Sequence, residues 1–294
     1  MLCRLTDDFY KFIKFISGAF MSDSTQKFKI VLAAFGTSAG SSAIYAGIKE
    51  RFEERFTQKV VMGFTSRVGN PKLKNVLEEI GPEKDLEVVI VPLFIIPGKV
   101  VLEDIKKVAE EFTSHFRSVR VARPLLPDDR IYEVVRGELL PDLEELEPGD
   151  TGILFVGHGT PERESSLIYR DVAQKVTSLF PPSVKVSFGN IDDSAPYCRD
   201  ALGELVMSGI KTLLIQPFMI VDGVHIHDDV KGALDGNHNG NKLYRHLLES
   251  YGESFKERLK EIECVYKPGL GAYPGVFELF ADHTQRAFSA GDVL

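Results

Sequence analysis

One histidine in this chain stands between two glycines at the end of an apolar run. The stretch ILFVGHGTPERESSLIY places His158 after four apolar residues and before a polar, helix-like run. His225 follows a second apolar run, TLLIQPFMIV, and Asp192-Asp193 follows VKVSFGNI. Two imidazoles and one carboxylate can hold a divalent transition metal and leave coordination positions open. We therefore expect a metal site formed by His158, Asp192 and His225, with Asp193 as the alternative acid.

Alternating apolar and amphipathic runs would position these residues. Strands that are apolar throughout and joined by helices are typical of parallel sheets covered on both faces. Ligands bind outside the carboxyl ends of such strands, where His158 and the segment 223–229 fall. In the second half we expect strands near 151–157, 184–191, 211–220 and 262–266, and helices near 163–179, 194–208 and 241–260.

The first half repeats this plan. KIVLAAFGTSAGSSAIYAGI resembles TGILFVGHGTPERESSLIYRDV, and VVIVPLFIIPGKVVLEDI resembles TLLIQPFMIVDGVHIHDDV. Self-similarity over so long a period indicates a duplicated domain. We expect an α/β protein with two similar doubly wound parallel-sheet lobes. The expected divisions are 1–28, an extension that is poorly ordered or helical, 29–140, and 141–294 with the metal site. In the first half we expect strands near 29–35, 59–64, 87–94 and 119–123, and helices near 41–56, 70–80 and 100–116.

The halves differ at the two histidines. Phe35 aligns with His158, and Val100 aligns with His225. A single histidine at a strand end is more often a hydrogen-bonded structural group. Two at equivalent strand ends, both missing from the other half, favour a function. We interpret the glycines beside His158 as clearing the approach to the imidazole and permitting a tight turn.

The remaining polar residues near these segments have weaker signals. We expect His227 beside the site or on the surface. Asp228 and Asp229 would cap the following helix or orient a ligand histidine, and we favour the cap. His238 would lie in a loop over the cleft. The histidines in charge-rich helical runs, expected to be solvated, are His115, His246 and His283.

Composition limits the classes of function. The 294 residues carry a formal charge of -8, which argues against nucleic-acid binding and means that an anionic ligand needs a locally basic pocket. The three cysteines form no CxxC pair, so neither a disulfide framework nor a thiolate zinc site is expected. Charges interrupt the apolar N-terminal segment, which therefore resembles neither an export signal nor a membrane span. We expect a cytoplasmic protein that does not bind membranes, and the sequence leaves both a monomer and a homo-oligomer open.

Several motifs together resemble one family. These are GHG before a helix, FGTS at the matching place in the first half, FTS at 64–66, IQPFMIVDGVH at 215–225 and GLGAYP at 269–274. They resemble the class II tetrapyrrole chelatases, and most of all the anaerobic cobaltochelatases of cobalamin biosynthesis. The likeness runs from about Lys29 to the C-terminus. It departs at Asp192, where the family has a glutamate, and at Phe94 and Val100, where the family often has a His and a Glu.

The resemblance implies a lyase-class enzyme that inserts Co(II) into sirohydrochlorin without ATP or an organic cofactor. His158 and His225 would be its catalytic residues, and with Asp192 they would hold the metal. A polycarboxylate substrate would need donors at its rim. The expected donors are the hydroxyls of Thr37, Ser38 and Thr160, the side chain of Arg67 or Lys99, and backbone N–H groups after Gly36 and Gly159.

Other readings stay open on the sequence. The departures leave room for a Ni(II) or Fe(II) chelatase, or for a non-catalytic metal or tetrapyrrole carrier. Histidine phosphatases need an arginine beside the nucleophilic histidine, and Gly157 occupies that place. Periplasmic binding proteins share the two-lobed plan, and the missing export signal argues against that class.

Overall fold

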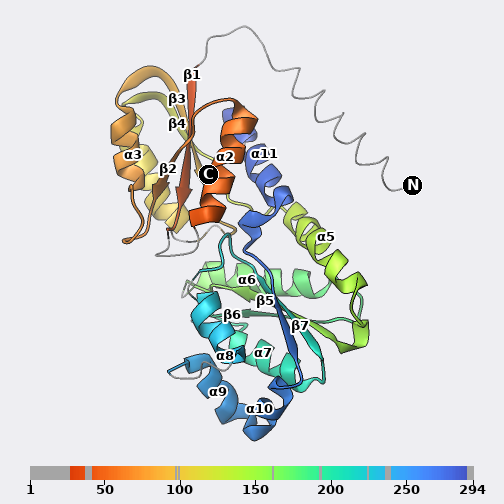
Figure 1. Ribbon diagram of the computed structural model, residues 1–294. Coiled ribbons are helices and arrows are strands. Elements are labelled where there is room, and N and C mark those ends of the chain that lie inside the picture. Colours follow the sequence, from red (N-terminus) through yellow and green to blue (C-terminus); the bar gives the residue numbers. More distant parts are fainter. Residues whose placement is uncertain are drawn as a thin grey trace, which may run out of the picture.

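Two lobes are visible in the computed structural model, each built on a four-stranded parallel sheet (Figure 1). It describes residues 27–36, 42–96, 98, 100–160, 162–191, 194–223, 225–235 and 240–289, with the backbone alone at 42, 100–102, 148, 163–165 and 225. The strand orders are β2-β1-β3-β4 and β6-β5-β7-β8. The expected α/β fold with two similar parallel-sheet lobes is confirmed.

The first lobe is built around strands that are buried along most of their length. The last five residues of β1 and the last seven of β3 are buried, as a sheet covered on both faces requires. Its elements are β1 (Lys27–Ala34), α2 (Ser42–Phe56), β2 (Val61–Phe64), α3 (Leu73–Ile80), β3 (Glu83–Pro92), the π-helix η1 (Val100–Ile105), α4 (Lys106–Phe112) and β4 (Phe116–Val121).

The second lobe repeats the order and adds helices. All seven residues of its central strand β5 are buried. Its elements are β5 (Thr151–Gly157), α6 (Arg163–Thr177), β6 (Lys185–Asn190), α7 (Cys198–Met207), β7 (Thr212–Pro217), the π-helix η3 (His225–Lys231), α8 (Gly232–Leu234), α9 (Lys242–Tyr251), α10 (Glu253–Leu259) and β8 (Glu263–Tyr266). A 3-10 turn, η2 (Pro148–Asp150), precedes β5.

The duplication extends to backbone details. Gly36 after β1 and Gly159 after β5 both have positive φ, 81° and 91°. The β2–α3 and β6–α7 connections each contain a cis proline, Pro71 and Pro196. In each lobe a π-helix, η1 or η3, follows the third strand in chain order. The two halves therefore share local geometry as well as element order.

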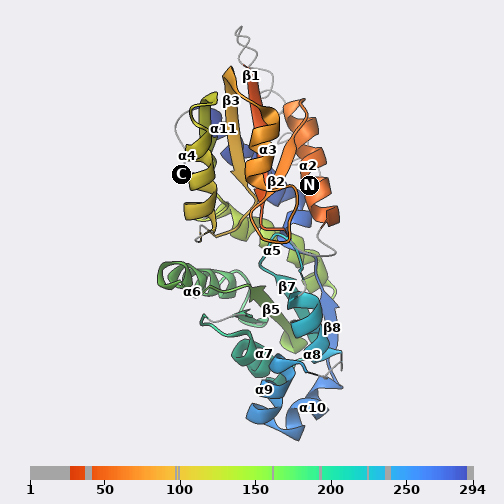
Figure 2. The same ribbon diagram turned by 90° about the vertical axis from the view of Figure 1, so that its left-hand side faces the viewer.

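Both faces of each sheet are covered by helices. On the first sheet, α3 and α4 pack on one face and α2 on the other, as Figure 2 shows from the side of α3 and α4. On the second sheet, α7, α9, α10 and η3 share one apolar cluster, and α6 lies on the opposite face. Two further helices complete the cover of the sheets, and each of them packs on the lobe other than the one it follows in the chain.

The helices α5 (Arg130–Glu144) and α11 (Pro274–Phe288) exchange lobes. Helix α5 follows β4 in the first half, yet Tyr132 stacks on Phe218 of the second lobe with ring centroids 6.3 Å apart. Helix α11 follows β8 through the 3-10 turn η4 (Leu270–Ala272) and returns to the first lobe beside α2 (Figure 1). There Phe277 packs edge-on against Phe52 at 5.3 Å. The chain thus crosses between the lobes at 122–130 and again at 267–273.

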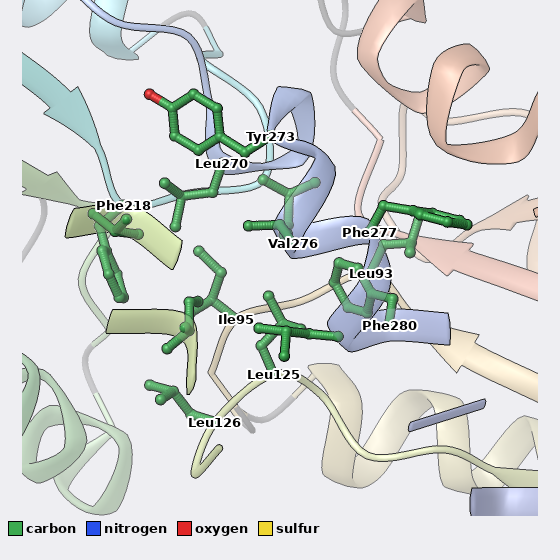
Figure 3. Packing of buried hydrophobic residues seen from close by; sticks show 14 of the residues in the cluster. Leu93, Ile95, Leu125, Leu126, Phe218, Leu270, Tyr273, Val276, Phe277 and Phe280 are labelled. Carbon is green, nitrogen blue, oxygen red and sulfur yellow. The ribbon is translucent and has the colours of Figure 1, made fainter. Parts of the chain in front are cut away.

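Apolar side chains from both lobes meet where these crossings lie. The cluster is continuous from Leu93 and Ile95 of the first lobe to Phe218 of the second, through side chains of α11 (Figure 3). Every labelled side chain in this view is at most 6 % exposed. Such burial contributes roughly 1.5 to 3 kcal/mol for each large side chain. The lobes therefore share one core, and the division at 140/141, which falls inside α5, stays a prediction.

Three local expectations are wrong. The single helix expected at 241–260 is two helices, because Gly252 between them has a φ of 63°. His283, expected to be solvated, is only 5 % exposed because it packs against the crossing segment, where its ring contacts Asp128 and the carbonyl of Arg123. His115 lies in a turn rather than a helix, half-buried against the rings of Phe112 and Phe116. In the described ranges, no helix is both long and apolar enough to span a bilayer.

Candidate active site

His158 follows the last residue of the central strand β5, and its side chain is exposed. Its Nδ1 lies 3.3 Å from the carbonyl oxygen of Gly159. A carbonyl oxygen can only accept, so Nδ1 carries the proton in this contact. Nε2 is then the ring nitrogen with a lone pair that can bind a metal. The strand end therefore places the exposed His158 imidazole at the carboxyl edge of the sheet, where ligands of parallel sheets bind.

The end of β6 lies beside the end of β5. Gly157 is in register with Asn190, and the N–H of Ile191 donates to the carbonyl of Gly157 at 3.0 Å. The chain thus leaves the sheet edge next to His158, one residue before Asp192. Asp192 and Asp193 lie outside the described residues, so the choice between them stays a prediction.

His225 is the first residue of η3, and the structure describes its backbone alone. The next residue, Ile226, is 3 % exposed and belongs to the same apolar cluster as Val156 of β5. Val156 lies two positions before His158, so the start of η3 and the end of β5 contribute side chains to one apolar cluster. This placement is compatible with both histidines binding one metal ion. Their joint binding stays a prediction.

The side chains that the structure describes form no metal site by themselves. Among those described, no three His, Cys, Asp or Glu residues gather closely enough to hold an ion. Asp192 and the side chain of His225 lie outside that set.

The expected rim donors fall mostly outside the described residues. Thr37, Ser38 and Lys99 belong to this group. Thr160 is half-buried, its N–H donates to Ser194 Oγ at 3.0 Å, and its Oγ1 accepts from the N–H of Glu162 at 3.3 Å. This hydroxyl supports the turn into α6, and its contact with a substrate stays a prediction.

Each of the two glycines around His158 has a structural reason, and the tight turn that we expected there is confirmed at Gly159. A Cβ on Gly157 would lie 2.4 Å from Asn190 Oδ1 and 2.7 Å from the ring of Phe188. Gly159 has a φ of 91°, which side chains disfavour. Gly157 thus permits close packing of β5 against β6, and Gly159 permits the turn. That the glycines also clear the approach to the imidazole stays a prediction.

The acidic pair in η3 does not cap a helix. Asp228 and Asp229 lie inside η3, and their backbone carbonyls accept from Asn241 Nδ2 at 2.9 and 2.8 Å. Asn241 itself caps α9 by accepting from the N–H of Tyr244 at 2.8 Å. The exposed His227 lies 3.5 Å from Asp222, which agrees with a surface position. His238 lies outside the described residues.

A cavity of about 500 Å³, which we did not expect from the sequence, opens at the same edge of the second sheet. The guanidinium of Arg199 lies 4.1 Å from the centre of the Tyr197 ring. Burial, with a smaller effect of Asp229, raises the pKa of the Cys198 thiol to about 12, so the thiol is neutral. The lining is Asn190, Ile191, Tyr197, Cys198, Arg199, Asp229, Gly240, Lys242, Leu243 and His246.

Arg199 and Lys242 outnumber the one acid of the lining, Asp229, so the cavity offers cationic groups to an anionic ligand. Arg199 lies in the first turn of α7, just after β6. A basic residue in the first turn after a strand end was the available sequence signal. His246 lines the cavity and is half-buried, rather than fully solvated as expected.

A family model for cobalt chelatase (CbiK) matches this chain over residues 2–107 and 83–289. The chain belongs to the cobalt chelatase family. The matched residues include β5, β6, β7 and η3, and hence the whole sheet edge around His158.

Curated relatives of this chelatase agree with that placement. The sirohydrochlorin cobaltochelatase CbiKC of Nitratidesulfovibrio vulgaris is 27% identical over 282 residues, which cover 90% of this chain and 91% of the relative. The sirohydrochlorin cobaltochelatase of Methanothermobacter thermautotrophicus is 27% identical over 136 residues, which cover 46% of this chain and 92% of the relative. A relative matched almost whole by less than half of this chain fits an internal duplication.

Solved structures share the fold of this chelatase. SirB from Bacillus subtilis with Fe³⁺ superposes with a TM-score of 0.65 at 14% identity, over 91% of this chain and 99% of that one. CbiX, described as the terminal enzyme of siroheme biosynthesis in denitrifying bacteria, gives 0.57 at 16% identity, over 88% and 99%. At these identities the likeness establishes the two-lobed fold.

Proposed function

We propose that this chain is a sirohydrochlorin cobaltochelatase, which inserts Co(II) into the tetrapyrrole without ATP in anaerobic cobalamin biosynthesis. The observation that supports this most is the position of His158 at the end of the central strand, with Nδ1 directed at Gly159. Curated relatives with the same named activity match nearly the whole chain or about half of it.

The proposed metal ligands are His158, His225 and Asp192. The first lobe supports Asp192 over Asp193. There Ser66, the second residue after β2, donates through Oγ to the carbonyl of Gly36 at 3.1 Å. Asp192 is likewise the second residue after β6, and Gly159 is the counterpart of Gly36. The corresponding position can thus reach the turn at the strand end.

The proposed reaction exchanges one Co²⁺ ion for two pyrrole protons. The ion moves from the imidazole and carboxylate ligands to the four ring nitrogens, and both N–H protons leave the macrocycle. The approaching cation helps these protons leave, because it stabilises the negative charge that develops on the ring nitrogens. Imidazoles released from the metal are suitable acceptors for those protons at neutral pH.

We propose two sets of contacts for the rim of the substrate. Arg199 and Lys242 of the cavity would bind carboxylate side chains of sirohydrochlorin. The hydroxyls of Thr37, Ser38 and Thr160 are proposed as further donors. The cavity begins at Ile191, whose N–H contacts the residue before His158, so rim and metal contacts are adjacent.

The test is an absorbance assay of sirohydrochlorin with purified protein and Co(II), Ni(II) or Fe(II). We expect multiple turnovers with Co(II), and a loss of at least about 100-fold in kcat/KM for His158→Ala and His225→Ala, because each removes a metal ligand. His227→Ala, an exposed histidine on the same helix as His225, is the matched control and should stay within about twofold.

Each outcome decides between the candidate functions. Unchanged insertion in His158→Ala or His225→Ala would remove that residue from the mechanism. Binding of one equivalent without release of metallated product would show a carrier. Turnover with Ni(II) or Fe(II) but not with Co(II) would show a chelatase for another metal.

A further inference from the structure

Ser194 makes hydrogen bonds to two segments of the second lobe. It lies between β6 and α7 and is 5 % exposed. Its Oγ accepts from the N–H of Thr160 at 3.0 Å and from Asn190 Nδ2 at 3.3 Å. Thr160 is the second residue after His158, in the turn that leaves β5, and Asn190 is the last residue of β6. One buried serine thus joins the turn after His158 to the end of the neighbouring strand.

The side chain of Asn190 also holds the backbone of this connection. Asn190 Nδ2 donates to the carbonyl of Ser194 at 3.1 Å, and the N–H of Asn190 donates to the carbonyl of Pro196 at 2.7 Å. Asn190 is 1 % exposed, so water does not compete for these bonds. In the sequence, the acidic pair 192–193 stands between Ile191 and Ser194. The residues on both sides of the pair are therefore fixed against the sheet.

The first lobe makes the same kind of link with a serine nearer to its strand. Ser66, the second residue after β2, is 7 % exposed. Its Oγ donates to the carbonyl of Gly36 and accepts from the N–H of Gly69, both at 3.1 Å. In the second lobe Asp192 is the second residue after β6, and the linking hydroxyl belongs to Ser194, the fourth. Both lobes have the link, and only in the second is the position nearer to the strand an acid.

We propose that Ser194 is a positioning residue for metal binding, which sets the distance between His158 and the acidic ligand of the pair 192–193. This inference rests on the proposed function, in which His158 and an acid of this pair bind one ion. A metal ion tolerates only small changes in the distances between its ligands. Both ligands follow strand ends in connecting segments, so contacts from other residues must hold them. Ser194 contacts both segments and provides this support.

The duplication offers a matched control for the test. Ser194→Ala and Ser66→Ala each remove one buried hydroxyl from the link of their lobe and add no atoms. Each leaves a backbone N–H, that of Thr160 or that of Gly69, without its acceptor. Both variants should therefore unfold at temperatures a few degrees lower than the wild type. The proposed metal ligands all lie in the second lobe, so a purely structural role would give the two variants the same behaviour.

The measurement is titration of each variant with Co(II) chloride, followed by the visible absorption of protein-bound cobalt. For Ser194→Ala we expect the Kd for Co(II) to rise about tenfold, as it does when residues that orient metal ligands are removed. For Ser66→Ala we expect a change within about twofold, because its link holds no ligand. An equal change in the two variants would show that Ser194 supports only the fold.

A double-mutant cycle tests whether Ser194 acts through the acid. The variant with both Asp192→Asn and Asp193→Asn loses the negative ligand, whichever of the two binds. In that background Ser194→Ala should change the Kd for Co(II) by less than about twofold, because the acid that Ser194 positions is already lost. A tenfold rise in both backgrounds would contradict the positioning role.

A further variant separates this inference from the proposed function. His158→Ala should lose most Co(II) binding. If it does, and Ser194→Ala changes the Kd no more than Ser66→Ala, the positioning role is wrong and the proposed function stands. If His158→Ala binds Co(II) as the wild type does, the metal role of His158 is wrong and the role of Ser194 is overturned with it.

Discussion

At the scale of single residues, charge is unevenly placed around the second sheet. The chain is acidic, yet Arg199 and Lys242 line the cavity beside the end of β6. Surface cations of this kind bind carboxylates through charge-assisted hydrogen bonds, which fix a substrate without entering the chemistry. Their removal should therefore weaken substrate binding more than it slows metal insertion.

This difference is measurable in the steady-state constants. For Arg199→Ala and Lys242→Ala we expect the KM for sirohydrochlorin to rise about fivefold to tenfold, with kcat within about twofold, because binding is lost equally in the ground and transition states. The Kd for Co(II) should not change. Arg245→Ala, on the same helix as Lys242 and outside the cavity lining, is the control. Unchanged KM in both cavity variants would contradict the rim assignment.

At the scale of elements, the last helix is tied to the first crossing between lobes by charged groups. His283 of α11 lies 3.0 Å from Asp128 through Nε2 and 3.2 Å from the carbonyl of Arg123 through Nδ1. Arg130 bonds both Asp128 and Asp282. Burial alone would raise the pKa of Asp128, but hydrogen bonds from Arg130 and His283 hold it well below the usual range.

Because the pKa of Asp128 is lowered in the folded state, its contribution to stability decreases as the pH falls. The contribution of Asp128 is present in full above the unfolded pKa of about 3.9, and it is lost as the pH falls toward the folded pKa. We expect Asp128→Asn to lower the free energy of unfolding by about 1 to 3 kcal/mol at pH 7. The difference from the wild type should narrow between about pH 5 and pH 3.

Urea unfolding at pH 7, 5, 4 and 3 measures this difference. The neighbouring Asp129, which pairs with Lys175 on the surface at 2.7 Å, gives a matched control, and Asp129→Asn should cost less than about 1 kcal/mol. A difference for Asp128→Asn that is the same at every pH would show that its charge does not stabilise the fold.

Elements with a simple pattern could be predicted from the sequence, and those buried by exchange between lobes could not. β1, β5 and β7 are apolar runs bounded by polar segments, so period and length were enough. Helix α5 contains Pro141, which discourages a helix assignment. Helix α11 buries residues on several sides, including His283 and Thr284, so its sequence lacks a clear polar face.

Some parts of the candidate site could likewise be predicted from the sequence, and others could not. The strand-end position of His158 follows from the order of strands in a parallel sheet, and the sequence was sufficient for it. The cavity depends on how α7, α9 and η3 pack over one another, which no local pattern records. The role of Gly157 depends on Asn190 of another strand, and that contact was likewise out of reach.

At the scale of the whole molecule, the shared core should make the two lobes unfold together. Phe277 of α11 is 6 % exposed and packs against the first lobe, although it follows the second lobe in the chain. We expect Phe277→Ala to lower the free energy of unfolding by about 3 to 5 kcal/mol. Hydrogen exchange of β1 and β5 amides in urea should report one midpoint for both strands, lowered equally by the substitution.

A half-exposed phenylalanine in the first lobe provides a control for Phe277→Ala. The control residue is Phe28 on β1, which is 37% exposed and contacts Phe288. Phe28→Ala should lower the free energy of unfolding by less than about 1.5 kcal/mol. Separate midpoints for β1 and β5 would show that each lobe unfolds alone, against a common core.

The central claim is that His158 and His225 bind one metal ion. A crystal structure of the protein soaked with Co(II), with anomalous data collected at the cobalt edge, tests it most directly. The account predicts one strong peak within bonding distance of His158 Nε2 and of the His225 imidazole, with a carboxylate of the 192–193 pair beside it. A peak bound by only one of these histidines, or a site elsewhere in the molecule, would contradict it.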